Sequence, residues 1–121
     1  MPRQTKTNGI TWETVREIAQ KLPGAEEGTS YGTPAFKVAK KLFVRFHQSG
    51  ESIAISMEID QREALMKTNP DVFYITDHYL KYPWVLVRLS AVNRNDLEKI
   101  IEESWRRNAP KKFTDLQHPK K

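Results

Sequence analysis

The 121-residue chain contains no cysteine, which excludes a disulfide framework and any chemistry that depends on a thiolate. It also lacks an apolar run approaching the roughly 18 residues that a membrane-spanning helix needs. The first residues, MPRQTKTNG, are polar, and no apolar stretch follows them as it would in a secretory signal. These absences predict a cytoplasmic protein with no membrane partner.

Motifs for catalysis and cofactor binding are missing as well. The three histidines, at positions 47, 78 and 118, fit no metal-ligand spacing. Gly28 and Gly32 are not followed by the lysine and helix that define a phosphate-binding loop. His78 has no identifiable group to orient it as a general base, because Asp77 is its neighbour in sequence. The sequence therefore predicts no metal, no cofactor and no enzymatic activity.

The net charge of +5 belongs to the two ends of the chain. Arg3 and Lys6 supply two positive charges, and the lysines at 111, 112, 120 and 121, less the charge of Asp115, supply the other three. Residues 8–110 are neutral overall. Net charge alone is therefore weak evidence for a nucleic-acid-binding surface on the body of the protein.

Hydrophobic periodicity predicts three helices, at 11–22, 60–68 and from the cap Asn93 to Ala109-Pro110. Alternating patterns predict five strands: two joined by a tight turn within 28–46, one around 53–57, and two at 72–75 and 84–89. Tight turns between neighbouring strands indicate an antiparallel sheet. The expected fold is therefore α+β, a two-layer sandwich with its helices on one face and the order α-β(3)-α-β(2)-α.

A chain of this length has one hydrophobic core. We expect a single domain over residues 9–108, because the last dozen residues carry no periodic pattern and contain Pro-Lys-Lys twice. Residues 1–8 and 109–121 are predicted to be flexible basic termini. The core is predicted to join the strands to the first and last helices through Leu42, Val44, Phe46, Ile53, Ile55, Val85, Val87, Val15, Ile18, Ile100 and Ile101.

The other sheet face, which no helix covers, is informative because its side chains are either solvated or bind something. By alternation it displays Lys37, Arg45, His47, Ser56 and Arg88, together with the apolar Phe43 and Leu86. One interpretation is a solvated face. The alternative is a surface that contacts phosphate groups.

The loop at 76–84 is dense in aromatic and polar side chains. Aromatic rings beside a lysine can stack on bases or hold a ligand, and loops often carry function. Packing of the same rings onto the domain is the alternative interpretation. The ligand-binding candidates in this loop are His78, Tyr79, Lys81, Tyr82 and Trp84.

Three segments resemble the MmcQ/YjbR family of small bacterial proteins: LPGAEEGTSYGTPAFKVAKKLFVRF at 22–46, TDHYLKYPWVLVRL at 76–89, and the closing helix with Ser104-Trp105. The resemblance covers nearly all of residues 11–107. It implies an α+β fold similar to secretion chaperones, a DNA-binding role and a monomer. The basic positions of the family pattern fall on Lys37, Lys41 and Arg45, and its loop pattern on His78, Tyr79, Tyr82 and Trp84.

Two functional hypotheses follow. In the first, the protein binds double-stranded DNA through phosphate contacts from Lys37, Lys41, Arg45, Arg88, Lys111 and Lys112. In the second, the open sheet face and the 76–84 loop bind a protein or a small acidic ligand. Clustering of the first four of these basic residues in one continuous patch would favour DNA over the other partners.

Overall fold

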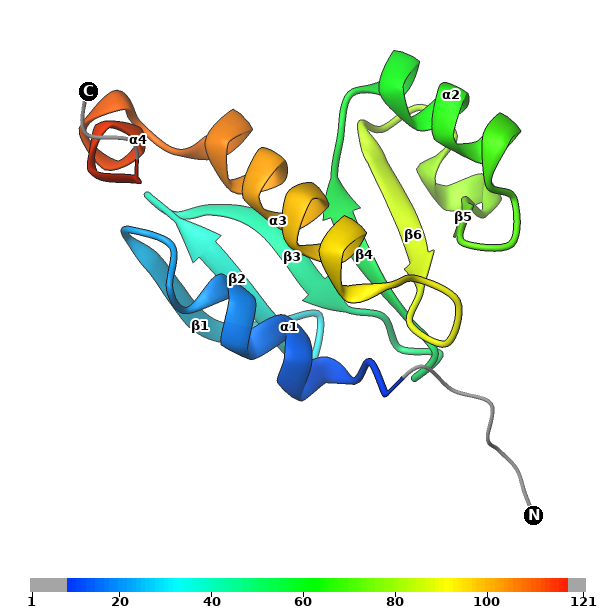
Figure 1. Cartoon of the computed structure of the whole chain (residues 1–121), viewed down its shortest axis with the longest axis horizontal. Helices are drawn as coiled ribbons and strands as arrows, with labels where there is room; N and C mark the ends of the chain where they lie inside the picture. Colours follow the sequence, from blue (N-terminus) through cyan, green and yellow to red (C-terminus); the bar gives the residue numbers. More distant parts are fainter. Residues whose placement is uncertain (1–8, 118–121) are drawn as a thin grey trace.

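The computed structural model describes residues 9–117 and shows an α+β fold built on one six-stranded antiparallel sheet, as predicted (Figure 1). The elements, in chain order, are α1 (Trp12–Ala19), β1 (Ala25–Ser30), β2 (Thr33–Val38), β3 (Lys41–Phe46), β4 (Ser52–Ser56), α2 (Ile59–Thr68), β5 (Phe73–Tyr74), the 3₁₀ turn η2 (Asp77–Tyr79), β6 (Trp84–Arg88), α3 (Arg94–Asn108) and α4 (Lys111–Gln117). None of the described helices is a candidate for crossing a membrane.

The strands lie in the order β1-β2-β3-β4-β6-β5, and every neighbouring pair is antiparallel. Two-residue turns connect β1 to β2 and β2 to β3. In the first, Tyr31 and Gly32 have φ values of 55° and 80°, and in the second, Ala39 and Lys40 have 51° and 70°. Positive φ at both central residues is the signature of a type I′ turn, whose twist matches that of the flanking strands.

Two predictions about the element order were wrong. The structure has four strands before α2 rather than three, because the strand β1 was not predicted. It also has a helix, α4, within the segment 109–121 that was expected to be a flexible tail. Phe113 of α4 packs against the main core, and its ring leaves no room for a side chain at Gly24, where a Cβ would lie 2.7 Å away. Residues 1–8 and 118–121, also expected to be flexible, lie outside the described residues.

Local signals in the sequence explain the two helices that cover the sheet. At the start of α1, the Thr11 amide donates a hydrogen bond to Thr14 Oγ1 at 3.2 Å. At the start of α3, Asn93 Oδ1 accepts one from the Asp96 amide at 2.8 Å, which confirms Asn93 as its cap. Helix α1 is shorter than predicted and ends at Ala19 rather than at residue 22.

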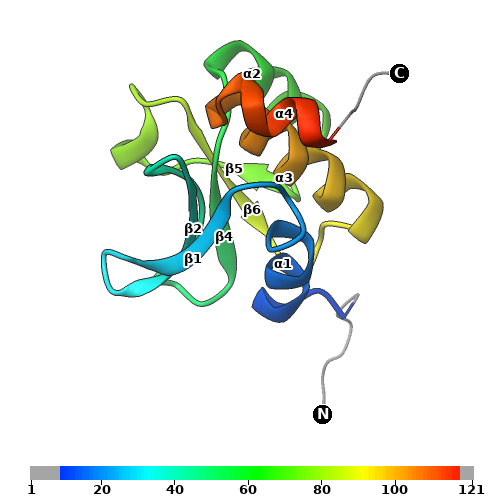
Figure 2. The same ribbon diagram turned by 90° about the vertical axis from the view of Figure 1, so that its left-hand side faces the viewer.

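Helices α1 and α3 lie on one face of the sheet, whereas α2 contacts β5 and β6 near the far edge (Figures 1 and 2). The prediction that the helices share one face holds for α1 and α3, and Leu65 and Met66 of α2 also pack against the core on that face. Between these two helices and the sheet lies the main core, which contains ten of the predicted residues, with Phe46 only partly buried: Val44, Phe46, Ile53, Ile55, Val85, Val87, Val15, Ile18, Ile100 and Ile101.

The remaining predicted core residue, Leu42, lies on the opposite face because of a β-bulge. Phe36 pairs with Val44 and Lys37 pairs with Leu42, so Phe43 is an extra residue on β3. Phe43 is fully buried in the main core, and its carbonyl accepts a hydrogen bond from Ser104 Oγ at 2.9 Å. The predicted faces of Leu42 and Phe43 are therefore exchanged.

Candidate functional site

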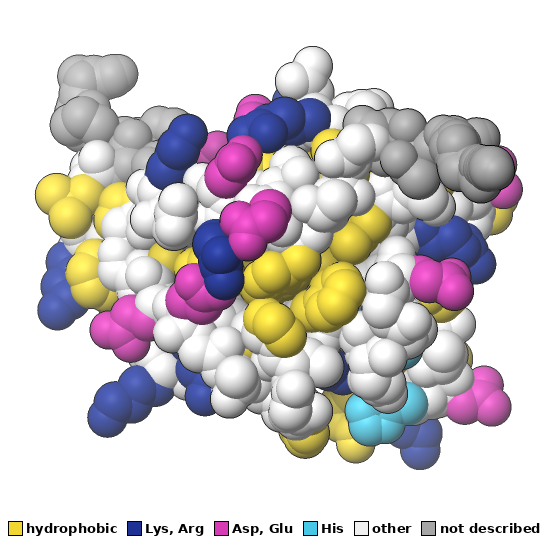
Figure 3. All heavy atoms as spheres, turned by 90° about the horizontal axis from the view of Figure 1, so that it is seen from below, with side chains coloured by type: hydrophobic (Ala, Val, Ile, Leu, Met, Phe, Trp, Pro, Cys, Tyr) yellow, Lys and Arg dark blue, Asp and Glu magenta, His cyan; other side chains and the backbone are white. Residues whose placement is uncertain are grey.

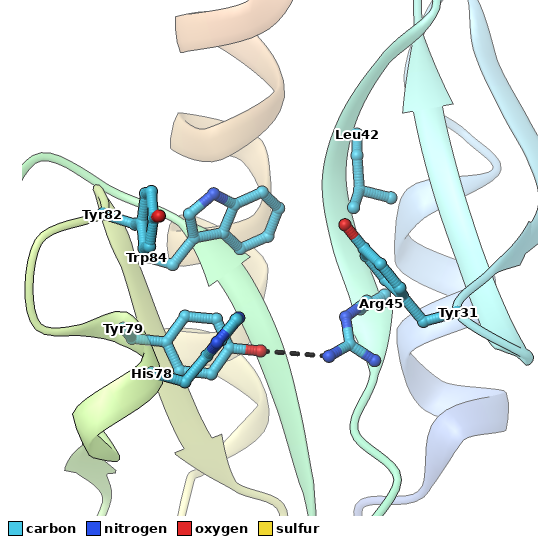
Figure 4. A pocket seen from close by; sticks show the side chains of 7 residues that line it. All are labelled: Tyr31, Leu42, Arg45, His78, Tyr79, Tyr82 and Trp84. Carbon is cyan, nitrogen blue, oxygen red and sulfur yellow. Dashed lines mark hydrogen bonds between the residues drawn. The ribbon is translucent and has the colours of Figure 1, made fainter.

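A groove lies on the open face of the sheet, between the 76–84 loop and the turn that joins β1 to β2 (Figure 4). Its first part has a volume of about 320 Å³ and is lined by Tyr31, Leu42, Arg45, His78, Tyr79, Tyr82 and Trp84. Its second part has a volume of about 510 Å³, shares four of these residues, and extends to His47, Gln48 and Thr76. We call the two parts together the Arg45 groove, because Arg45 lines both.

Arg45 is a buried cation, with 7% of its surface exposed. Its guanidinium carbon lies 5.2 Å from the centroid of the Tyr31 ring. Among residues 9–117 it forms no salt bridge with a carboxylate, although buried arginines are normally paired. Its hydrogen bonds go to four neutral oxygens: Thr33 Oγ1 (3.2 Å), the Phe46 carbonyl (3.3 Å), the Tyr79 hydroxyl (3.0 Å) and Gln48 Oε1 (3.4 Å).

Tyr79 anchors the loop on the open face. Its side chain is 6% exposed and packs with Ala54 and Leu86 in a second, smaller core cluster. Its hydroxyl accepts the hydrogen bond from Arg45 across a separation of 34 residues (Figure 4). The ring of His78 meets that of Tyr79 edge-on, with centroids 4.8 Å apart. The loop therefore covers part of the face that the helices leave open.

A second buried arginine, Arg62 of α2, holds the backbone of this loop in place. It is 1% exposed, and its Nε and Nη2 also donate to Glu63 Oε2 at 3.2 and 3.1 Å. Its Nη1 and Nη2 groups donate to four backbone carbonyls of one loop: Tyr79 (2.9 Å), Leu80 (3.2 Å), Tyr82 (2.8 Å) and Trp84 (3.1 Å). Arg62 thereby fixes the backbone that carries most of the groove's aromatic rings.

Sequence reasoning missed Arg62, although a signal was present. Arg62 precedes Leu65 and Met66 by three and four residues, and both of these side chains pack against the main core. Residues at this spacing share one face of a helix. An arginine on the inward face of a short helix indicates a buried hydrogen-bonding role.

Four of the five ligand-binding candidates in the loop line the groove: His78, Tyr79, Tyr82 and Trp84. The fifth, Lys81, is exposed and is not among the lining residues. Tyr82 is 56% exposed, and Tyr31, which sequence reasoning did not single out, is 86% exposed. The groove therefore presents aromatic rings to solvent on both of its sides.

The candidate phosphate contacts on the sheet do not share one face. Lys37 is exposed and pairs with Leu42, so it lies on the open face. Lys41 pairs with Val38 of the main core, so it lies on the helix-covered face. Arg88 donates to the carbonyls at positions 70 and 71, each at 3.2 Å, and stacks 4.1 Å above the Tyr74 ring. The continuous patch that would favour DNA is therefore not formed by these residues and Arg45.

The remaining two candidate phosphate contacts belong to α4. Lys111 pairs with Asp115 at 3.2 Å, and Lys112 Nζ lies 5.1 Å from the centroid of the Phe113 ring. On the face shown in Figure 3, acidic side chains lie among the lysines and arginines, and apolar side chains gather at the centre.

Two further residues of the predicted open face have other partners. Ser56 Oγ accepts a hydrogen bond from Arg107 Nε of α3 at 3.2 Å. His47 lies at the polar end of the groove, with its Nδ1 3.0 Å from Ser49 Oγ. Partial burial and the neighbouring charge of Arg45 lower the pKa of His47, so its ring adds no positive charge at neutral pH. Within residues 9–117, no three His, Asp or Glu side chains are grouped as metal ligands.

Comparison with known proteins identifies the family. The YjbR family model matches residues 20–107. The uncharacterised proteins Rv2570 of Mycobacterium tuberculosis and Mb2600 of Mycobacterium bovis are each 45% identical over 118 residues, covering 85% of this chain and 92% of the relative. The crystal structure of Deinococcus radiodurans protein DR2400, with a DUF419 domain, has a TM-score of 0.73 and 21% identity, covering 93% of this chain and 88% of that one. The structural likeness shows the fold alone, but the family match and the relatives together show that the chain belongs to the YjbR family.

Proposed function

We propose that this protein is a non-enzymatic binding module that takes a small organic anion in the Arg45 groove. The observation that supports this most directly is a buried guanidinium with no carboxylate partner among residues 9–117. Taking a charge out of water costs several kcal/mol unless an opposite charge and good hydrogen bonds compensate it. An anion in the groove supplies that opposite charge.

An anion can replace one of the neutral oxygens that accept hydrogen bonds from Arg45. Its bonds to neutral oxygens measure 3.0 to 3.4 Å, and the longest goes to Gln48. A guanidinium and a carboxylate approach to about 2.7–2.9 Å and interact roughly twice as strongly as neutral groups do. A carboxylate that replaces the Gln48 oxygen would therefore gain hydrogen-bond energy as well as charge compensation.

The groove suits a small molecule better than a nucleic-acid backbone. Phosphate contacts on DNA come from cations that project from the surface, whereas Arg45 is 7% exposed and enclosed by rings. DNA binding is a second proposal, and its support is that all four lysines among the predicted contacts are exposed: Lys37, Lys41, Lys111 and Lys112. Contacts of this kind would be to phosphates and independent of base sequence.

Thermal unfolding in acetate tests the proposed anion site. With a dissociation constant of about 10 mM, acetate at about 100 mM would add about 1.4 kcal/mol to the free energy of unfolding. This corresponds to a rise of roughly 5 °C in the melting temperature relative to equimolar chloride. Arg45→Gln should lose this rise, whereas Lys37→Gln, which removes an exposed charge from the same face, should keep it. An equal rise in Arg45→Gln would contradict the proposal.

A further inference from the structure

The two ends of the Arg45 groove differ in chemistry, and the difference narrows the class of ligand. At one end, Leu42, Tyr82 and Trp84 offer apolar and aromatic surface. At the other end, the groove widens towards His47, Gln48 and Thr76. We infer that the ligand is an aromatic carboxylic acid, with its carboxylate on Arg45 and its ring at the Leu42 end. This inference rests on the proposed function, since it places the anion on the same guanidinium.

A ring fits this end because two aromatic side chains there have no ring partner of their own. Within residues 9–117, neither Trp84 nor Tyr31 pairs with another aromatic ring, although His78 contacts both Tyr79 and Tyr82. Figure 4 shows Tyr31 and Leu42 on one side of the groove and Trp84 and the loop tyrosines on the other. Aromatic rings favour partners whose centroids lie about 4.5–7 Å away, so a flat ligand between the two sides would gain contacts from both.

The backbone at Tyr31 supports a binding role for its side chain. Its φ of 55° lies in the left-handed region, which a bulky residue rarely occupies and which type I′ turns usually fill with asparagine, aspartate or glycine. The Tyr31 side chain is 86% exposed, so the strain is not explained by burial in a core. Its ring centroid lies 5.2 Å from the guanidinium carbon of Arg45. The turn itself requires a positive φ at this position, so the unusual feature is the residue type: an exposed aromatic residue that faces the anion site stands where asparagine or glycine is usual.

The charges that line the groove favour a carboxylate over a phosphate dianion. Arg45 is the one arginine or lysine among the residues that line the two parts of the groove. The lowered pKa of His47 disfavours a positive charge on its ring, and Arg45 is the permanent positive charge of the groove lining. One guanidinium matches the single charge and planar fork of a carboxylate.

Isothermal titration with three probes tests the inference: phenylacetate, cyclohexylacetate and phenylacetamide. We expect cyclohexylacetate to bind about fivefold more weakly than phenylacetate, because it lacks the aromatic faces. Phenylacetamide, which lacks the charge, should bind at least about tenfold more weakly. A peptide ending in phenylalanine would bind as tightly as phenylacetate if the carboxylate comes from a protein terminus, and more weakly if it comes from a free acid.

Tyr31→Asn and a matched control variant separate the ligand class from the fold. Tyr31→Asn should weaken phenylacetate binding about fivefold and leave acetate binding unchanged. Ala39→Asn relieves a similar φ, 51°, in the other I′ turn and should change neither affinity. Both variants should melt at or above the wild-type temperature, because asparagine tolerates this backbone better.

The outcomes distinguish the inference from the proposed function. Equal affinities for phenylacetate and cyclohexylacetate, with Arg45→Gln abolishing both, would overturn the aromatic class and leave the anion site standing. Unchanged phenylacetate binding in Tyr31→Asn would likewise overturn the aromatic class and leave the anion site standing. Phenylacetamide binding as tightly as phenylacetate, or binding of any probe that survives in Arg45→Gln, would overturn the anion site itself and the inference with it. No detectable binding of any probe at about 10 mM would overturn both.

Discussion

Replacing Arg62 by methionine is expected to destabilise the protein and to loosen the loop that forms one side of the groove. Methionine has a similar length but donates no hydrogen bonds. The change removes the arginine donors of four carbonyls, those of Tyr79, Leu80, Tyr82 and Trp84. Two of the four, Tyr79 and Tyr82, keep hydrogen bonds from the Tyr82 and Trp84 amides at 3.1 and 2.8 Å. The side chain of Arg62 is 1% exposed, so water does not reach the site without local rearrangement.

The size of the effect follows from the carbonyls that lose an arginine donor and are not compensated by a backbone amide within residues 9–117, those of Leu80 and Trp84. A buried polar group left unsatisfied costs about 1–3 kcal/mol, and the loop can turn some of these carbonyls towards solvent. Apolar packing of the methionine offsets part of the loss. We expect a net loss of about 3 kcal/mol, which is a large share of the roughly 5–15 kcal/mol that stabilises a domain of this size.

Urea unfolding followed by tryptophan fluorescence measures the loss in the free energy of unfolding, and amide hydrogen exchange shows which residues it affects. Exchange should accelerate at residues 79–84 more than in β4. The matched control is Arg94→Met, because Arg94 forms exposed salt bridges with Glu17 and Glu98 at 3.4 and 3.1 Å. The control should lose less than about 1 kcal/mol. Equal losses in the two variants, or unchanged exchange in the loop, would refute the role assigned to Arg62.

Three further outcomes are expected. Val44→Asp places a carboxylate in the main core, so circular dichroism should show an unfolded domain, and wild-type melting would contradict the core assignment. Because the pKa of His47 is lowered in the folded state, the unfolded state binds a proton more readily. The contribution of His47 to the free energy of unfolding should be complete above about pH 6.5 and should be lost as the pH falls through the lowered pKa of the folded state. His47→Gln should remove this part of the pH dependence in urea titrations. If the protein binds DNA, the double variant Lys111→Gln, Lys112→Gln should lower the slope of log affinity against log salt by about 1.8 in fluorescence anisotropy. No binding by the intact chain near physiological salt would reject DNA as a partner.

The fold class, the main core and the α3 cap were predictable because their signals are local. Val44, Ile53 and Ile55 alternate along their strands, and Asn93 stands directly before a helical stripe. Strand β1 was missed because its exposed residues lack that alternation and pair only with β2. Helix α4 was missed because it is seven residues long and packs mainly through Phe113.

The groove was predictable only in part. Alternation assigned Arg45 to the open face, and the density of aromatic and polar residues identified the 76–84 loop as a candidate site, but neither signal indicated that the two are in contact. The burial of Arg45 depends on Tyr79, 34 residues away in sequence, and on a loop position set by Arg62. Leu42 and Phe43 lie on the faces opposite to those predicted because β3 has a bulge opposite Phe36 and Lys37. The bulge accompanies the packing of Phe43 into the main core, which the alternation along the strand does not indicate.

The anion site at Arg45 is tested most directly by the Nε–H resonance of that side chain in a proton–nitrogen NMR spectrum during acetate titration. We predict that the Arg45 signal moves and saturates, with a dissociation constant of about 10 mM, when acetate replaces chloride at constant ionic strength. The signals of Arg62 and Arg88, which donate to backbone carbonyls, should stay in place. An unmoved Arg45 signal, or a parallel drift of all three signals without saturation, would contradict an anion site at Arg45.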